Sequence, residues 1–154
     1  MSDGDYKSDM SIDERVLMAI VRVAERFKKN ASALFKEHGL TFPQYNVLRV
    51  LDASKNGQNT IRNVNRIMLV SGANMTGIAK RLEKTGFIIR KSDPNDDRLK
   101  RLEITPKGRE VLKNISEEKE YNIKRYLMKY SDEEKSSLLE NLREILAHTN
   151  REWR

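Results

Sequence analysis

The sequence predicts a mainly α fold with a small two-stranded β wing, a winged helix-turn-helix with long dimerisation helices at both ends. Capping residues precede apolar stripes of helical spacing, and the spacing changes once to a strand-like pattern near residue 87. Residues 60–110 also carry twelve Lys and Arg against six Asp and Glu, which accounts for six of the net charge of +7. Such a segment indicates a module that faces a polyanion, although charge alone would equally fit a solvated surface.

The N-terminal part is expected to form a disordered tail (1–10) followed by one long amphipathic helix (11–37). Ser11 and Glu14 have the spacing of a capping box, and His38-Gly39 ends the apolar stripe. Such a helix is more than about 35 Å long at about 1.5 Å per residue, longer than a small domain needs for itself. We therefore expect this stripe to pack against a second chain.

Residues 41–105 carry the pattern of a winged helix-turn-helix. Thr41–Gln44 is a second capping box with Pro in its first turn, and it begins a helix that fades by Gly57. Asn59 or Thr60 is expected to cap a short third helix. The inward-facing side chains of that third helix are predicted to be Ile61, Val64, Ile67 and Met68.

A recognition helix is predicted next, after a tight connection at Leu69-Val70. Ser71 is expected to cap it, and it runs to about Thr85 with Gly86 at the left-handed C-terminal position. Its apolar stripe has the spacing i, i+3, i+4, i+7 and consists of Met75, Ile78, Ala79 and Leu82.

The wing and the last two helices complete the pattern. Residues 87–91 and 99–104 are predicted to be antiparallel strands joined by a turn over 92–97. Thr105-Pro106 then begins a long helix, and the capping box Ser131–Glu134 begins a last one. We expect 106–150 to be the second part of the dimerisation region.

The predicted recognition helix and wing carry side chains suited to duplex DNA. Small residues let the helix approach base edges, Asn and Thr can read them, and Lys and Arg contact phosphates. Arg98 is expected at the wing tip in a minor groove, oriented by an ion pair with Asp96, while Lys91, Lys100 and Arg101 flank it. The predicted DNA-binding residues are Thr60, Ser71, Gly72, Ala73, Asn74, Thr76, Lys80, Arg81, Lys91, Asp96, Arg98 and Lys100.

Three stretches of this sequence resemble the MarR (multiple antibiotic resistance regulator) family. They are Leu40–Leu48, Arg81–Ile88 and the wing segment from Asp93 to Thr105, in which Asp96 and Arg98 match the family signature. The resemblance spans roughly residues 11–148. It implies an obligate homodimer, a pseudo-palindromic operator, and repression relieved by a small aromatic or anionic effector. In such proteins the effector pocket lies between the dimer helices and the DNA-binding lobe, where His38, Phe42 and Tyr45 are the candidates here.

Several other classes are disfavoured by composition. The chain has no Cys and only two His, far apart, so a thiolate or dedicated transition-metal site is not expected. No catalytic constellation or phosphate-binding glycine loop is present, which argues against an enzyme, and no cofactor is predicted. The apolar runs are too short for a membrane span, so a cytoplasmic protein is expected. Two alternatives remain open at this point: a winged-helix module that binds an acidic protein, and an architectural DNA binder without an effector.

Overall fold

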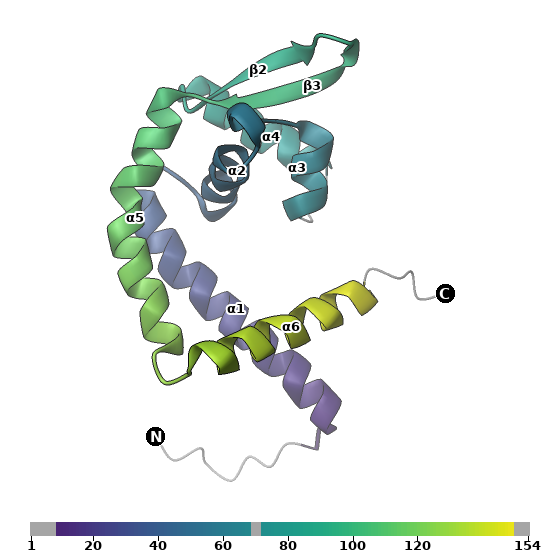
Figure 1. Ribbon diagram of the computed structural model, residues 1–154, viewed down its shortest axis with the longest axis vertical. Helices are drawn as coiled ribbons and strands as arrows, with labels where there is room; N and C mark the ends of the chain where they lie inside the picture. Colours follow the sequence, from purple (N-terminus) through teal and green to yellow (C-terminus); the bar gives the residue numbers. More distant parts are fainter. Residues whose placement is uncertain (1–8, 69–71, 150–154) are drawn as a thin grey trace. The chain divides into compact units, whose positions relative to one another are not determined.

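The computed structural model describes residues 9–68 and 72–149, and Figure 1 labels their helices and strands. They form two compact units that divide between Ile115 and Ser116, inside α5. The predicted mainly α class with a small β wing is confirmed, while the expected tail falls largely outside the described residues. In chain order the elements are α1 (Ile12–Glu37), α2 (Phe42–Asp52), the short 3-10 helix η1 (Lys55–Gly57), β1 (Gln58–Thr60), α3 (Ile61–Met68), α4 (Gly72–Lys84), β2 (Ile88–Asp93), β3 (Asp96–Ile104), α5 (Pro106–Leu127) and α6 (Asp132–Thr149).

The helices begin at the residues that the capping signals predict. At α1 the Glu14 amide donates to Ser11 Oγ (3.2 Å), and the helix ends at Glu37 with His38 as its C-terminal cap, before Gly39, whose φ is +76°. At α2 the capping box is complete, because the Gln44 amide donates to Thr41 Oγ1 (3.3 Å) and the Thr41 amide donates to Gln44 Oε1 (3.0 Å). Each such bond satisfies a backbone amide that the helix itself leaves without a partner.

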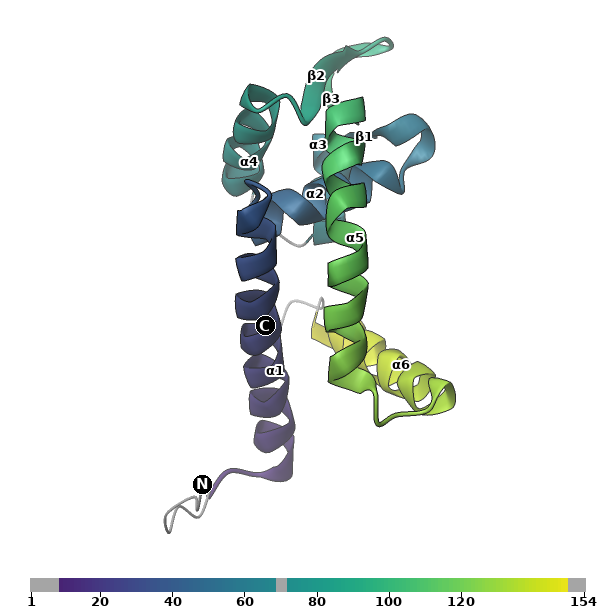
Figure 2. The same ribbon diagram turned by 90° about the vertical axis from the view of Figure 1, so that its left-hand side faces the viewer.

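The core of the first unit is built around α2. Two views show α2 between α4 and the first turns of α5 (Figure 1, Figure 2). The largest fully buried side chains come from these helices, from α3 and from the strands: Leu48, Leu51, Met75, Leu82, Ile88, Leu102, Ile115, Val47 and Val64. Packing of this kind fixes the orientation of α4 on the sheet, which is what a recognition element needs.

The sheet has three antiparallel strands in the order β1-β3-β2. The third strand, β1, was not predicted, because three residues are too few to show a strand pattern. It pairs with β3 through Asn59 opposite Leu102, so it closes one edge of the wing at its base.

The wing and α3 correct two predictions. The strands extend to Asp93 and start again at Asp96, so the turn is shorter than the predicted 92–97 and Arg98 lies within β3. Ile67, which was predicted to face inward, is 54% exposed, whereas Val64 on the same helix is fully buried. A helix of only two turns can bury one narrow face: Val64 occupies its centre, and Ile61 and Met68 are partly buried against the core as predicted.

The second unit contains the end of α5 and α6. The predicted capping box begins α6, because the Glu134 amide donates to Ser131 Oγ (3.1 Å) and the Ser131 amide donates to Glu134 Oε2 (2.8 Å). The side chains of α6 are not buried in this chain, and four of its leucines are exposed: Leu138, Leu139, Leu142 and Leu146.

Candidate nucleic-acid interface

Helix α4 separates its apolar and polar side chains onto two faces. The predicted stripe of Met75, Ile78, Ala79 and Leu82 is buried against the core. The side chains that the sequence predicted for DNA lie on the other side, where Asn74, Thr76, Lys80 and Arg81 are exposed. Lys84 is exposed in the last turn of the same helix. One side of α4 is therefore polar at its start and basic further along, as the sequence predicted.

The C-terminal end of α4 is attached to the strands and to α5. Gly86 has φ +80°, which is easily adopted by glycine, and the Phe87 amide donates to Leu82 O (3.0 Å) as the chain leaves the helix. The Lys107 ammonium donates to Thr85 O (2.7 Å), and Thr105 Oγ1 donates to Gly86 O (2.6 Å).

A salt bridge adds a direct link between α4 and β2, with Arg90 Nε 2.8 Å from Glu83 Oε2. Helix α4 and the wing are thus held to each other by contacts within one unit.

The base of the wing is held by alternating charges across β2 and β3. Lys91 and Arg101 are opposite one another in the register, which places two cations side by side. Each is paired with a carboxylate on the other strand: Lys91 Nζ is 2.5 Å from Glu103 Oε2, and Arg101 Nε is 2.7 Å from Asp93 Oδ2. Two of the predicted phosphate contacts therefore already have partners within the wing.

These pairs lower the pKa values of both carboxyl groups. The hydrogen bond from Arg101, aided by the Asn95 amide, lowers the pKa of Asp93 below its ordinary value. The hydrogen bond from Lys91 lowers the pKa of Glu103 in the same way. Both groups are consequently ionised throughout the neutral range, and the two pairs persist there.

Arg98 has a different setting from Arg101. Its side chain is 95% exposed, and its Nε lies 3.7 Å from Asp96 Oδ1. Asp96 also accepts the Arg98 amide (3.0 Å), so it fixes the backbone from which the side chain extends. Lys100 is exposed as well and donates to Ser92 Oγ (3.2 Å). Arg98 and Lys100 are therefore exposed cations of the wing, and Arg98 forms the predicted ion pair with Asp96.

The remaining predicted residues lie near the start of α3 and α4. Thr60 is half-buried and accepts the Asn63 amide (3.1 Å) on Oγ1, so it caps α3 as predicted. Gly72 and Ala73 belong to the first turn of α4. Ser71, predicted to cap α4, and the predicted connection at Leu69-Val70 lie outside the described residues.

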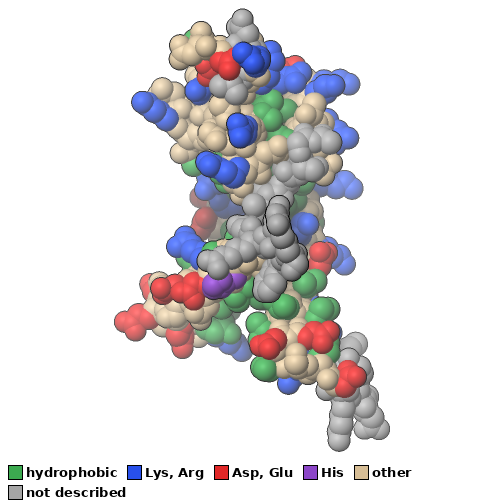
Figure 3. Space-filling view, turned by 90° about the vertical axis from the view of Figure 1, so that its right-hand side faces the viewer, with side chains coloured by type: hydrophobic (Ala, Val, Ile, Leu, Met, Phe, Trp, Pro, Cys, Tyr) green, Lys and Arg blue, Asp and Glu red, His purple; other side chains and the backbone are tan. Residues whose placement is uncertain are grey.

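Basic side chains are prominent on the first unit. In the upper part of Figure 3 many Lys and Arg side chains project from the surface with few acidic ones beside them, in agreement with the charge excess of residues 60–110. The sequence reasoning missed Glu83, Arg90, Asp93 and Glu103. The alternation of charges along the two strands could have indicated Asp93 and Glu103. Their partners can be inferred only when the register of the strands is known.

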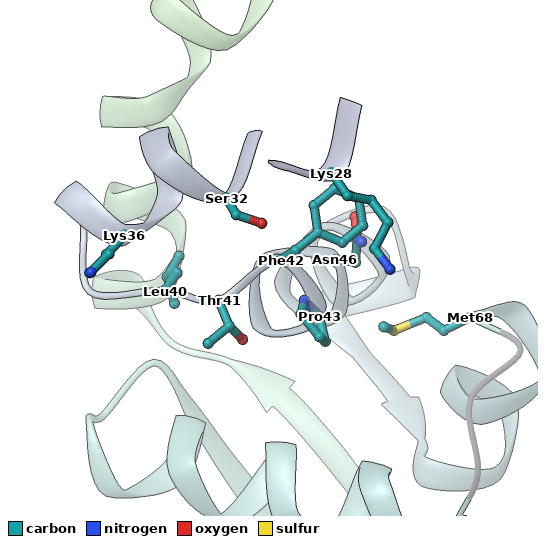
Figure 4. Close-up of a pocket in the computed structure, with 9 residues that line it drawn as sticks. All are labelled: Lys28, Ser32, Lys36, Leu40, Thr41, Phe42, Pro43, Asn46 and Met68. Carbon is teal, nitrogen blue, oxygen red and sulfur yellow. The ribbon is translucent and has the colours of Figure 1, made fainter. Parts of the chain in front are cut away.

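A pocket of about 720 Å³ lies in the same unit, away from the wing. Its lining residues come from α1, the turn after it, α2 and the end of α3, as Figure 4 shows. They are Lys28, Ser32, Lys36, Leu40, Thr41, Phe42, Pro43, Asn46 and Met68.

Of the three effector candidates predicted from the sequence, Phe42 lines this pocket. His38 is the C-terminal cap of α1, and Tyr45 is buried with its ring stacked on Phe35 at 3.8 Å between centroids.

The described residues carry neither a metal site nor a membrane-spanning helix. No group of three or more His, Cys, Asp or Glu side chains in this part of the chain is arranged to hold a metal ion. None of the helices among residues 9–68 and 72–149 is long and apolar enough to cross a membrane.

The fold and the exposed face of α4 beside a basic wing define the class of winged helix-turn-helix DNA-binding proteins. Residues 38–99 match the model of the MarR family. The chain is 32% identical over 132 residues to the transcriptional regulator BilQ of Clostridioides difficile, covering 84% of this chain and 86% of BilQ. It therefore belongs to the MarR family of DNA-binding transcriptional regulators.

Other known proteins agree with this assignment. The regulator TtmR of Methylorubrum extorquens is 34% identical over 109 residues, which cover 71% of this chain but only 55% of TtmR. The MarR family regulator Sco3205 of Streptomyces coelicolor, solved in complex with DNA, has a similar fold with a TM-score of 0.84 at 19% identity, covering 96% of this chain and 94% of Sco3205. The organohalide-sensing regulator RdhR-CbdbA1625, solved in its 2,4-dichlorophenol bound form, has a similar fold with a TM-score of 0.80 at 18% identity. The match covers 97% of this chain and 89% of RdhR-CbdbA1625.

Proposed function

We propose that this chain is a homodimeric repressor that binds a pseudo-palindromic duplex operator and whose DNA affinity is modulated by a small effector. One observation carries the DNA-binding part: a polar and basic face of α4 lies in the same unit as a wing whose Arg98 is almost fully exposed. The helix suits the major groove, and the arginine suits a neighbouring minor groove. The similar fold of Sco3205, whose structure contains DNA, supports this assignment.

The homodimer is supported by apolar side chains that this chain leaves exposed. In α1 the exposed large side chains are Ile12, Val16, Leu17, Met18, Val21 and Val23, and α6 exposes the four leucines named above. Burying apolar surface contributes about 25 cal/mol per Å², so two such helices stabilise an assembly far more than they stabilise one chain. A second copy is the partner that covers both helices symmetrically.

The effector is supported by the pocket between α1 and α2. The pocket has the size of a small-molecule site and combines apolar with polar lining residues. It lies against α1, which carries the exposed apolar side chains, and against α2 and α3 of the winged helix-turn-helix. A ligand there contacts both parts and can favour one arrangement of them over another. RdhR-CbdbA1625, with its bound 2,4-dichlorophenol, is a precedent within this fold.

Selection of bound sequences from a pool of random duplex DNA tests the proposal most directly. We expect enriched sites with two inverted half-sites whose centres are about 10 base pairs, or a multiple of that, apart. Binding without sequence preference at physiological salt would instead favour the architectural DNA binder. Absence of any duplex binding would favour the module that binds an acidic protein partner.

A further inference from the structure

Two lysines stand at separate places along one wall of the pocket. Lys28, Ser32 and Lys36 line it from α1 at intervals of four residues, so they lie on one side of that helix. Eight residues separate the two lysines, which corresponds to about 12 Å along the helix axis. Figure 4 shows Lys36 at one end of the lining and Lys28 toward the other, with Ser32 between them.

The opposite wall is mainly apolar and is held in place by aromatic packing. Leu40, Phe42, Pro43 and Met68 supply it. The Phe42 ring lies 6.0 Å from the ring of Phe27 and 6.0 Å from the ring of Phe35, centroid to centroid. This wall is therefore formed before any ligand arrives, which reduces the entropic cost of binding.

The charges of the lining are unbalanced. Its nine residues include two cations and no carboxylate. Among the described residues neither Lys28 nor Lys36 forms a salt bridge, and the Lys28 ammonium lies 5.9 Å from the centroid of the Phe42 ring. A cation–π contact at this distance is weak and can be exchanged for a carboxylate.

From this arrangement we infer that the pocket takes an elongated dianion with an apolar middle, of the chemical class of the aliphatic α,ω-dicarboxylates. One carboxylate pairs with Lys36 and the other with Lys28, while the methylene chain lies along Leu40, Phe42 and Met68. A neutral ligand gains nothing from the two lysines, and a monoanion pairs with one of them. Only a dianion of matching length pairs with both, and this inference rests on the proposed effector function of the pocket.

The test compares ligands that differ only in charge. Saturated dicarboxylates of six to fourteen carbons are titrated into the full chain by calorimetry at constant ionic strength, alongside the monoamide and the diamide of each. We expect an optimum at one chain length, with affinity falling about fivefold from diacid to monoamide and again to diamide, as for ion pairs of partly exposed groups.

Three variants assign the effect to the two lysines. Lys28→Met and Lys36→Met should each lower diacid affinity about fivefold and abolish the preference for the diacid over its monoamide. Lys29→Met is the matched control, because Lys29 is an exposed lysine of the same helix that does not line the pocket. It should leave both quantities unchanged.

The possible outcomes separate this inference from the proposed function. Equal affinity for diacid and monoamide, no binding at any length, or the same loss in Lys29→Met as in the other variants would overturn it. DNA affinity is then measured with and without the best diacid. Binding of the diacid with no change in DNA affinity would support the ligand class while contradicting the effector role.

Discussion

Arg98 and Arg101 stand three residues apart on β3, and their surroundings give them different roles. The Arg101 guanidinium is fixed to Asp93 across the hairpin, 2.7 Å from its carboxylate. Arg98 has its side chain in solvent, with Asp96 at the longer distance of 3.7 Å. Long exposed side chains retain their freedom until they meet a partner, so we expect Arg98 to contact DNA and Arg101 to maintain the shape of the wing.

Arg98→Ala is therefore expected to weaken operator binding without changing stability. The loss should be about 1–3 kcal/mol if the arginine enters a groove, and it should depend on A·T content next to the half-site. Fluorescence anisotropy at several salt concentrations measures both the loss and the slope of log affinity against log salt. Lys129→Ala, which removes an exposed cation from outside the winged helix, is the control. Unchanged binding in Arg98→Ala would contradict the assignment of the wing to DNA.

The Asp93 carboxyl gives a prediction that depends on pH. Its pKa is lowered in the folded state, mainly by the hydrogen bond from Arg101, so its ionisation stabilises the fold at pH values above the unfolded pKa of about 4. That contribution is lost as the pH falls through the folded pKa. Asp93→Asn should therefore lower the free energy of unfolding at pH 7, and its effect should shrink below about pH 4.

Urea unfolding at pH 7 and pH 3 measures this difference. Glu140→Gln is a suitable control, since Glu140 is exposed and forms no salt bridge among the described residues. A destabilisation by Asp93→Asn that is as large at pH 3 as at pH 7 would mean that packing, rather than the ion pair, explains the role of Asp93.

At the scale of elements, the sequence predicted those features that depend on residues close together in the chain. The starts of α1, α2, α5 and α6 follow from hydroxyl caps that bond amides three residues away, so a window of four residues is enough to find them. The buried stripe of α4 follows from helical periodicity in the same way. The polar face of that helix is fixed once the buried face is known, so this part of the candidate site was predictable too.

Features set by contacts between distant segments were not predictable in this way. Strand β1 forms because its backbone pairs with the edge of β3. The Asp93–Arg101 pair depends on the register of the hairpin. The pocket requires α1, α2 and α3 to meet, which no single stretch of sequence encodes. Of the predicted effector residues only Phe42 lines it, because Tyr45 packs on Phe35 in the core.

Two glycines offer a prediction about how α4 and α5 are built. A Cβ on Gly108 would lie 2.4 Å from Phe87 O and 2.8 Å from Ile104 Cγ1, whereas one on Gly77 of α4 would have no atom within 4 Å. Gly108→Ala should therefore destabilise the protein by about 2 kcal/mol or more, because the backbone itself must move. Gly77→Ala should be neutral or stabilising by up to about 1 kcal/mol, since alanine favours a helix.

Thermal unfolding and DNA binding of both variants separate fold from function. If α4 enters the major groove closely at Gly77, Gly77→Ala should weaken DNA binding although the protein is at least as stable. Normal stability of Gly108→Ala would contradict the tight approach of α5 to the backbone of Phe87. Normal DNA binding by Gly77→Ala would exclude close contact at that position.

At the scale of the whole molecule, charge and apolar surface are divided between different parts of the sequence. The winged helix-turn-helix carries nearly all of the excess positive charge. The flanking stretches 1–59 and 111–154 together carry an excess of only one positive charge, and α1 and α6 within them expose large apolar side chains. In the proposed dimer, the apolar part would associate with its copy and place two α4 helices on one duplex, which would raise the affinity for DNA without any new type of contact.

The leucines of α6 make this division testable. Leu138, Leu139, Leu142 and Leu146 lie on one side of the helix, and Ser137 lies on the opposite side at about 100° per residue. Sedimentation at micromolar concentration should give a mass of twice 18.0 kDa. Leu142→Glu should shift it toward the monomer, because the new carboxylate would be buried without a partner at the interface.

Ser137→Glu adds the same charge outside the stripe, so it should remain dimeric. We expect the proposed dimer to bind DNA more tightly than a single chain, since one half-site contact is much weaker than two linked contacts. Leu142→Glu should therefore lose affinity for a two-half-site operator by at least tenfold, while its weak binding to a single half-site stays the same. A Leu142→Glu variant that remains dimeric would show that α6 does not form the interface. A monomeric variant with undiminished operator affinity would show instead that each winged helix acts alone, and the pseudo-palindrome would then have no physical basis in this chain.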